Sequence, residues 1–153
     1  MSHIIVDACI DPIGKDNAHK PKTGEWVQLE LFGPIHGFTL KHTENPGTTH
    51  ERLAVLYHFR TEAPTNTRYV MVHSGTGIPH LEGNTWHVYA EDEVGAGRWK
   101  LNNTGEHLVL ENPNGQVVHE KRFAAHHCGK PKIVVPPVVV AAPAFGTVKW
   151  WVR

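Results

Sequence analysis

Serine is almost absent from this chain of 153 residues. Its only serines are Ser2 and Ser74, and neither lies in the Gly-x-Ser-x-Gly turn that exposes a nucleophile. The sequence also lacks a His-Glu-x-x-His motif and a phosphate-binding glycine loop. We therefore predict no catalytic residues and no cofactor, and we expect that the protein is not an enzyme.

Long apolar runs are missing as well. The longest extends from Ile133 to Phe145 and is interrupted by three prolines, so no segment of about 18 apolar residues could span a membrane. The first residues lack the basic and apolar regions of a signal peptide. These features predict a cytoplasmic protein without a membrane partner.

Cysteine is scarce, with Cys9 near one end of the chain and Cys128 near the other. We interpret both as reduced thiols, because a free cysteine packs like a small apolar side chain. A disulfide between the first strand and the C-terminal segment stays open as the alternative, since the sequence does not fix the distance between the two sulfurs.

Histidine is abundant, at 13 residues, and raises the question of a metal site. The weak candidates for ligands are His119, His126, His127 and Cys128. Structural zinc takes four ligands, and no second short-spaced cluster accompanies them, so we predict no metal. The seven-residue spacing of His73, His80 and His87 does not place three side chains on one face of one strand, which makes it a weak signal.

The remaining pattern is that of an all-β protein. No segment keeps a helical period over ten residues, whereas short apolar runs alternate with turn residues. The sequence Asn112-Pro113-Asn114-Gly115 between two apolar runs predicts a hairpin. We expect strands at His3–Ile10, Glu25–Phe32, Gly37–His42, Leu53–Arg60, Arg68–His73, Asn84–Tyr89, His107–Glu111 and Gln116–Phe123.

Five segments, in order, resemble the lamin-tail domain family. They are Pro12–Asp16 followed by Gly24–Leu29, then Gly37–Leu40, Tyr57–Phe59, Trp99–Glu106, and the hairpin around Asn112–Gly115. The chain differs from the family pattern in having Glu106 where aspartate is usual, and in an insertion at about Gly75–Gly97.

The resemblance implies an immunoglobulin-like β-sandwich over residues 1–123, of the kind found alone in bacterial proteins. It also implies a structural, protein-binding module without catalytic residues. We interpret the matched residues as structural. Trp26 and Trp99 are expected in the core, Gly14, Gly105 and Gly115 at special backbone angles, and Asp16, Asn102 and Asn103 in loops whose backbone they bond.

Residues 124–153 form a C-terminal extension that is apolar, rich in proline and basic. Residues 121–153 hold six basic and no acidic residues, so residues 1–120 hold 15 − 6 = 9 basic and 15 acidic residues. The zero net charge therefore divides into −6 for the body and +6 for the C-terminal part. Such asymmetry indicates an interaction surface.

We expect this extension to dock as an extended or edge segment, either on its own body or on another copy, which would make a homo-oligomer. Both routes stay open, and so does nucleic-acid binding by the basic, tryptophan-containing tail. The predicted interaction residues are Lys130, Lys132, Val138, Val140, Lys149, Trp150, Trp151 and Arg153 in the extension, with Glu91, Asp92 and Glu93 as an acidic acceptor.

Overall fold

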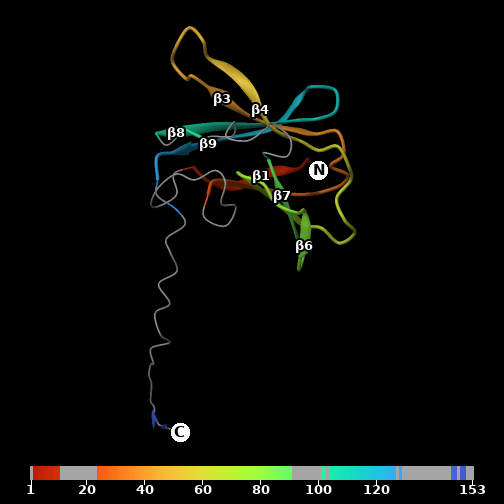
Figure 1. Cartoon of the computed structure of the whole chain (residues 1–153), viewed down its shortest axis with the longest axis vertical. Helices are drawn as coiled ribbons and strands as arrows, with labels where there is room; N and C mark the ends of the chain where they lie inside the picture. Colours follow the sequence, from red (N-terminus) through yellow and green to blue (C-terminus); the bar gives the residue numbers. More distant parts are fainter. Residues whose placement is uncertain are drawn as a thin grey trace.

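The computed structural model describes residues 2–10, 24–90, 101–102, 104–126, 128, 146–147 and 149–150. These residues form an all-β protein, and none of them lies in a helix that could cross a membrane. Two sheets pack face to face as the layers of a β-sandwich (Figure 1). This confirms the predicted fold class.

One layer is a five-stranded sheet in the order β1-β2-β5-β7-β6. Its pairs are antiparallel except β5 and β7, which run parallel. Its strands are β1 (Ile4–Cys9), β2 (Trp26–Glu30), β5 (Tyr69–His73), β6 (His80–Glu82) and β7 (Thr85–Tyr89).

The other layer is a four-stranded antiparallel sheet in the order β4-β3-β8-β9. Its strands are β3 (Thr39–Glu44), β4 (Arg52–His58), β8 (Gly105–Glu111) and β9 (Val117–Ala124). The hairpin of β3 and β4 diverges from β8 after His42, because β3 pairs with β8 only from Thr39 to His42, opposite Glu111 to Leu108, although β8 begins at Gly105. A separate short parallel pair joins β10 (Gly146–Thr147) to β11 (Lys149–Trp150).

The core lies between the layers and follows from strand alternation. In β2, Val27 and Leu29 are buried while their neighbours are partly exposed, and β5 repeats the pattern with Val70 and Val72. From the other layer, the side chains of Leu40, Leu56, Phe59, Leu108 and Leu110 complete the core.

All eight predicted strands are present, with bounds that shift by a few residues. The prediction missed β6, a strand of three exposed residues inside the expected insertion. Gly105 and Gly115, predicted at special backbone angles, have positive φ angles of 142° and 81°. Trp26, which was expected in the core, is only partly buried, because in β2 the inward positions are Val27 and Leu29. Trp99, Gly14, Asp16 and Asn103 lie outside the described residues.

The two layers are joined along one edge, where β1 lies beside β9. The pairing of β1 with β2 is interrupted at Val6, which leaves backbone groups of β1 to be satisfied from elsewhere. The Ile5 amide donates to Nδ1 of His119 at 3.0 Å, and Nζ of Lys121 donates to the Val6 carbonyl at 3.0 Å. Nε2 of His126 donates to the Ala8 carbonyl at 3.1 Å. Side chains therefore cover this edge of the sandwich.

A disulfide closes the same edge. Cys9 and Cys128 are bonded, with their Cα atoms 5.6 Å apart and a separation of 119 positions in the sequence. The interpretation of two reduced thiols is therefore wrong. It failed because the pairing depends on β1 lying beside the end of β9, a contact between distant segments that no local pattern reveals.

We predict that replacing both cysteines (C9A/C128A) lowers the free energy of unfolding by about 2–5 kcal/mol, because the bond restricts a long loop in the unfolded chain. Urea unfolding of the oxidised protein and of the double variant measures this difference. Adding a thiol reductant should destabilise only the wild type, and equal midpoints with and without reductant would contradict the prediction.

Candidate functional site

Two buried carboxylates hold a short segment between the two sheets. Oε1 of Glu25, just before β2, accepts the Leu101 amide at 2.7 Å. Oε2 of Glu106, in β8, accepts the next amide along the chain, that of Asn102, at 3.0 Å. Since the side chain of Leu101 is itself in the core, this pair of amides connects both sheets to one segment.

The Glu106 carboxylate is the centre of a polar network. It also accepts a hydrogen bond from Nδ1 of His42 at 3.0 Å and one from Nδ2 of Asn102 at 2.8 Å. Nδ2 of Asn102 lies 3.0 Å from the Thr43 carbonyl as well, and so links β3 to β8 beyond the point where their pairing ends. This confirms the prediction that Asn102 is a loop residue that satisfies backbone groups.

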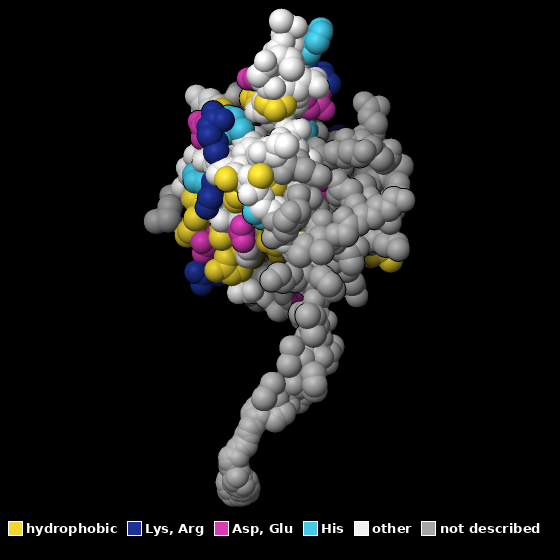
Figure 2. All heavy atoms as spheres, turned by 90° about the vertical axis from the view of Figure 1, so that its left-hand side faces the viewer, with side chains coloured by type: hydrophobic (Ala, Val, Ile, Leu, Met, Phe, Trp, Pro, Cys, Tyr) yellow, Lys and Arg dark blue, Asp and Glu magenta, His cyan; other side chains and the backbone are white. Residues whose placement is uncertain are grey.

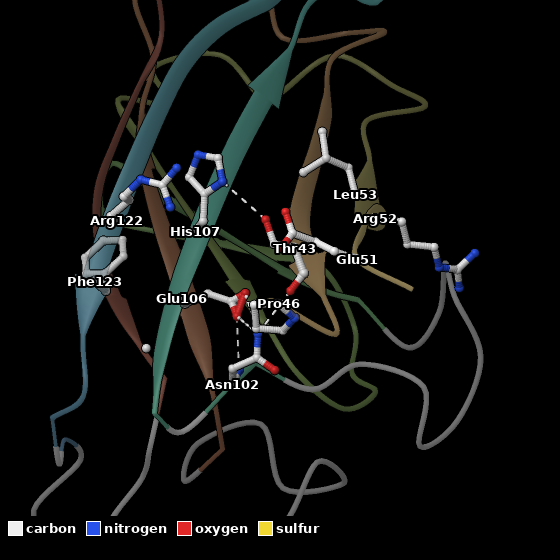
Figure 3. A pocket seen from close by; sticks show the side chains of 11 residues that line it. Thr43, Pro46, Glu51, Arg52, Leu53, Asn102, Glu106, His107, Arg122 and Phe123 are labelled. Atoms are coloured by element: carbon white, nitrogen blue, oxygen red, sulfur yellow. Dashed lines mark hydrogen bonds between the residues drawn. The ribbon is translucent and has the colours of Figure 1, made fainter. Parts of the chain in front are cut away.

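A cleft of about 540 Å³ lies above this network, between the projecting β3–β4 hairpin and the β8–β9 pair. Figure 3 shows His107 and Arg122 on one side, Thr43 and Leu53 on the other, and the Glu106–Asn102 pair at one end. The guanidinium of Arg52 points away from the cleft and pairs with Glu44 at 2.8 Å. The lining also includes Pro46, Glu51, Gly105 and Phe123.

A hydroxyl, an imidazole and a carboxylate form a row along the cleft. Glu120 accepts from Nε2 of His107 at 2.7 Å, so Nδ1 is free to accept the hydroxyl of Thr43, at 3.2 Å. This order resembles a hydrolase triad, which also needs donors for an oxyanion. The nearby amides of Asn102 and Gly105 already donate to Glu106 and to the Asn102 carbonyl. The row therefore fixes the position of His107. Neither of these two amides is available to bind an oxyanion.

The edge strand β4 borders the cleft and exposes apolar side chains. Leu53 and Val55 are 42% and 43% exposed, and among the described residues β3 is the only strand that pairs with β4. In Figure 2 the hairpin tip projects from the body, above a face where charged side chains of both signs are interspersed with hydrophobic ones. An edge strand with exposed apolar residues can accept another strand.

A second polar cluster, a histidine ladder, lies on the outer face of the five-stranded sheet. His73, His87 and His80 come from β5, β7 and β6, and neighbouring ring centroids are 5.0 and 4.9 Å apart. Glu82 accepts from Nε2 of His87, and Nε2 of His73 lies 2.8 Å from Nδ1 of His87. A seven-residue spacing does not place three side chains on one face of one strand; these histidines meet because β5, β7 and β6 are neighbours in the sheet.

Tyr89 stacks against the ladder, with its ring centroid 5.2 Å from that of His73. Burial, and secondly the charge of Glu82, raise the pKa of Tyr89 above its usual value. Both nitrogens of His87 are used within this cluster, whereas the cleft is open. We therefore regard the cleft and the adjoining β4 edge as the candidate site.

The candidate metal ligands serve other purposes. Cys128 is bonded to Cys9, while His119 and His126 bond the backbone of β1. His127 lies outside the described residues. In the described part of the chain, no group of three or more histidine, cysteine or acidic side chains could hold a metal ion.

The predicted interaction residues are not brought together. Lys149 and Trp150 lie in β11, and nothing is described of their side chains. The other predicted interaction residues lie outside the described residues: Lys130, Lys132, Val138, Val140, Trp151, Arg153, Glu91, Asp92 and Glu93. The sequence does carry a signal for the β4 edge: Leu53–Leu56 is apolar at four consecutive positions, so both faces of the strand bear apolar side chains.

Comparisons with known proteins do not assign a family: no family model matches the chain, and no curated protein matches its sequence. The resemblance to lamin-tail domains, which depends on short motifs, stays a prediction.

We predict that Glu106→Ala destabilises the fold by about 3–5 kcal/mol, because it leaves buried donors of His42 and Asn102 without their acceptor. The matched variant Glu120→Ala removes a carboxylate that is 58% exposed and should cost less than about 1 kcal/mol. Thermal and urea unfolding measure both. Similar losses for the two variants would show that the Glu106 network contributes no more than a surface pair.

Proposed function

We propose that this chain is a non-enzymatic protein-interaction module that binds an extended partner segment along strand β4. The observation that carries the proposal is the exposed apolar edge formed by Leu53 and Val55. A partner strand added there would gain main-chain hydrogen bonds from β4 and would cover these two side chains.

The contrast between the two edges of the four-stranded sheet supports this choice. At β9, side chains and a disulfide fill the space against β1. At β4, two of the three exposed positions, Leu53 and Val55, are apolar, and the charge of Arg52 stands only at the start of the strand, although natural edge strands are commonly protected by charges, prolines or bulges. The β3–β4 pair does contain an irregularity at Leu40–Lys41, but Leu53 and Val55 remain exposed.

The cleft adds specificity to the same edge. Leu53 belongs to both features, so a segment that pairs with β4 passes the mouth of the cleft. The far side of the cleft carries Arg122, which forms no ion pair with another described residue, and the hairpin side carries Glu51, which accepts the Gly47 amide. This mixture of apolar and charged groups fits a peptide with both kinds of side chain.

The lamin-tail resemblance is compatible with this proposal. An immunoglobulin-like sandwich that binds proteins as a stand-alone module is what the motifs imply, and the two-layer all-β fold fits that class. The disulfide, however, favours an oxidising compartment over the cytoplasmic location expected from the sequence.

Nucleic-acid binding is the second candidate, and it depends on the basic extension alone. Six basic residues within 121–153 could contact phosphates, while the rest of the chain has a formal charge of −6. If nucleic acid were the partner, affinity for DNA would fall steeply with salt. The protein-interaction proposal expects no such salt-dependent complex in a fluorescence titration.

The test of the proposed site compares two exposed valines. Val55→Lys places a charge on the β4 edge and should abolish self-association or partner binding, so that light scattering gives the monomer mass of 17.1 kDa. Val117→Lys alters β9 at a side chain that is 50% exposed and should leave the mass unchanged. Equal behaviour of the two variants, with both still folded by circular dichroism, would remove β4 as the site.

A further inference from the structure

We propose that the segment accepted by β4 is the C-terminal extension of a second copy of this chain, which produces a head-to-tail assembly. The inference depends on the proposed function, because it names the partner of the same β4 edge. Four features of the chain support it: where the extension starts, its sequence pattern, its charge, and the position of the acceptor.

The start of the extension is fixed at the edge opposite β4. Cys128 is bonded to Cys9 in β1, and His126 bonds the Ala8 carbonyl beside it. In the sheet order β4-β3-β8-β9, three strand spacings separate this edge from β4, a distance of about 14 Å. The donor and acceptor edges are thus separate surfaces of one molecule.

The sequence of the extension suits an edge position. Ile133–Val135 and Val138–Val140 are short runs of β-branched residues, the type that pairs well in sheets. Prolines at 136, 137 and 143 interrupt them, and proline is tolerated only at the edges of a sheet. Such segments can add to β4 on one side, and their apolar side chains can cover Leu53 and Val55.

Charge complements the shape. The cleft is lined by two carboxylates, Glu51 and Glu106, and two guanidinium groups, Arg52 and Arg122. Two further carboxylates, Glu44 and Glu120, pair with the lining residues Arg52 and His107, so the lining and these neighbours together carry 2 − 4 = −2. The extension carries Lys130, Lys132, Lys149 and Arg153, without an acidic residue. Complementary charge favours association of the extension with this end of the sandwich and should make it weaker at high salt.

The separation of the edges determines the symmetry. Because each copy would donate from the β1–β9 edge and accept at β4, the contact joins two different surfaces and is heterologous. Heterologous contacts continue from copy to copy into a ring or an open filament. A β4-to-β4 dimer, in contrast, would be closed and would not need the extension.

Mixing two impaired variants of the full-length chain tests the inference. Val55→Lys damages the acceptor and keeps the donor, whereas the double variant Val138→Asn/Val140→Asn damages the donor and keeps the acceptor, without changing the charge. We expect each variant alone to be a monomer of 17.1 kDa and an equimolar mixture to form a heterodimer of twice that mass by light scattering.

Three results would overturn the inference. If the wild type is a monomer, the extension does not join copies. If the donor variant assembles like the wild type while Val55→Lys does not, β4 still binds a partner, so the proposed function stands and the occupant is wrong. If the mixture stays monomeric although both variants are folded, donor and acceptor are not complementary.

Discussion

The sandwich depends on two adjacent backbone amides that are held by two buried carboxylates. Glu25 belongs to the five-stranded layer and Glu106 to the four-stranded layer, and they accept the amides of Leu101 and Asn102 respectively. A buried carboxylate is costly unless its oxygens are hydrogen-bonded. The two amides therefore stabilise the buried carboxylates, and the carboxylates in turn hold the segment in its position. The packing of Leu101 and the opening of the cleft follow from that arrangement.

The two edges of the four-stranded sheet have opposite character. The β9 edge uses polar side chains to satisfy the interrupted β1 strand and a disulfide to hold the chain beyond it. The β4 edge is exposed and apolar, and it ends at a cleft with charges of both signs. One sheet thus combines a sealed edge with an edge suited to binding, which is the basis of the proposed interaction.

Local patterns predicted the strands because alternation and turn residues act within a few positions. Val27 and Leu29 are buried as their spacing implies, and the Asn112–Gly115 turn joins β8 to β9. Strand β6 was not predicted because it has only three residues, all exposed, which is too short for a period to be recognised. Its place in the sheet comes from pairing with β7.

The candidate site could not be predicted in the same way, because its parts come from distant segments. Whole strands separate Thr43 from His107 in the sequence, and the two meet only because β3 lies beside β8, whereas Glu120 reaches His107 across the β8–β9 hairpin. The Cys9–Cys128 bond and the histidine ladder have the same origin. The Trp99–Glu106 motif did indicate where a structural network would lie, since it contains both Asn102 and Glu106, but not that His42 completes it.

The disulfide also determines how the fold would carry mechanical load. Strand β9 is an edge strand, so tension applied to the chain after Ala124 would otherwise separate β9 from β8 one hydrogen-bonded pair at a time. The Cys128–Cys9 bond instead transmits that tension into β1, whose partner β2 lies between β1 and β5. In an assembly joined through C-terminal extensions, tension would therefore reach both sheets of every copy.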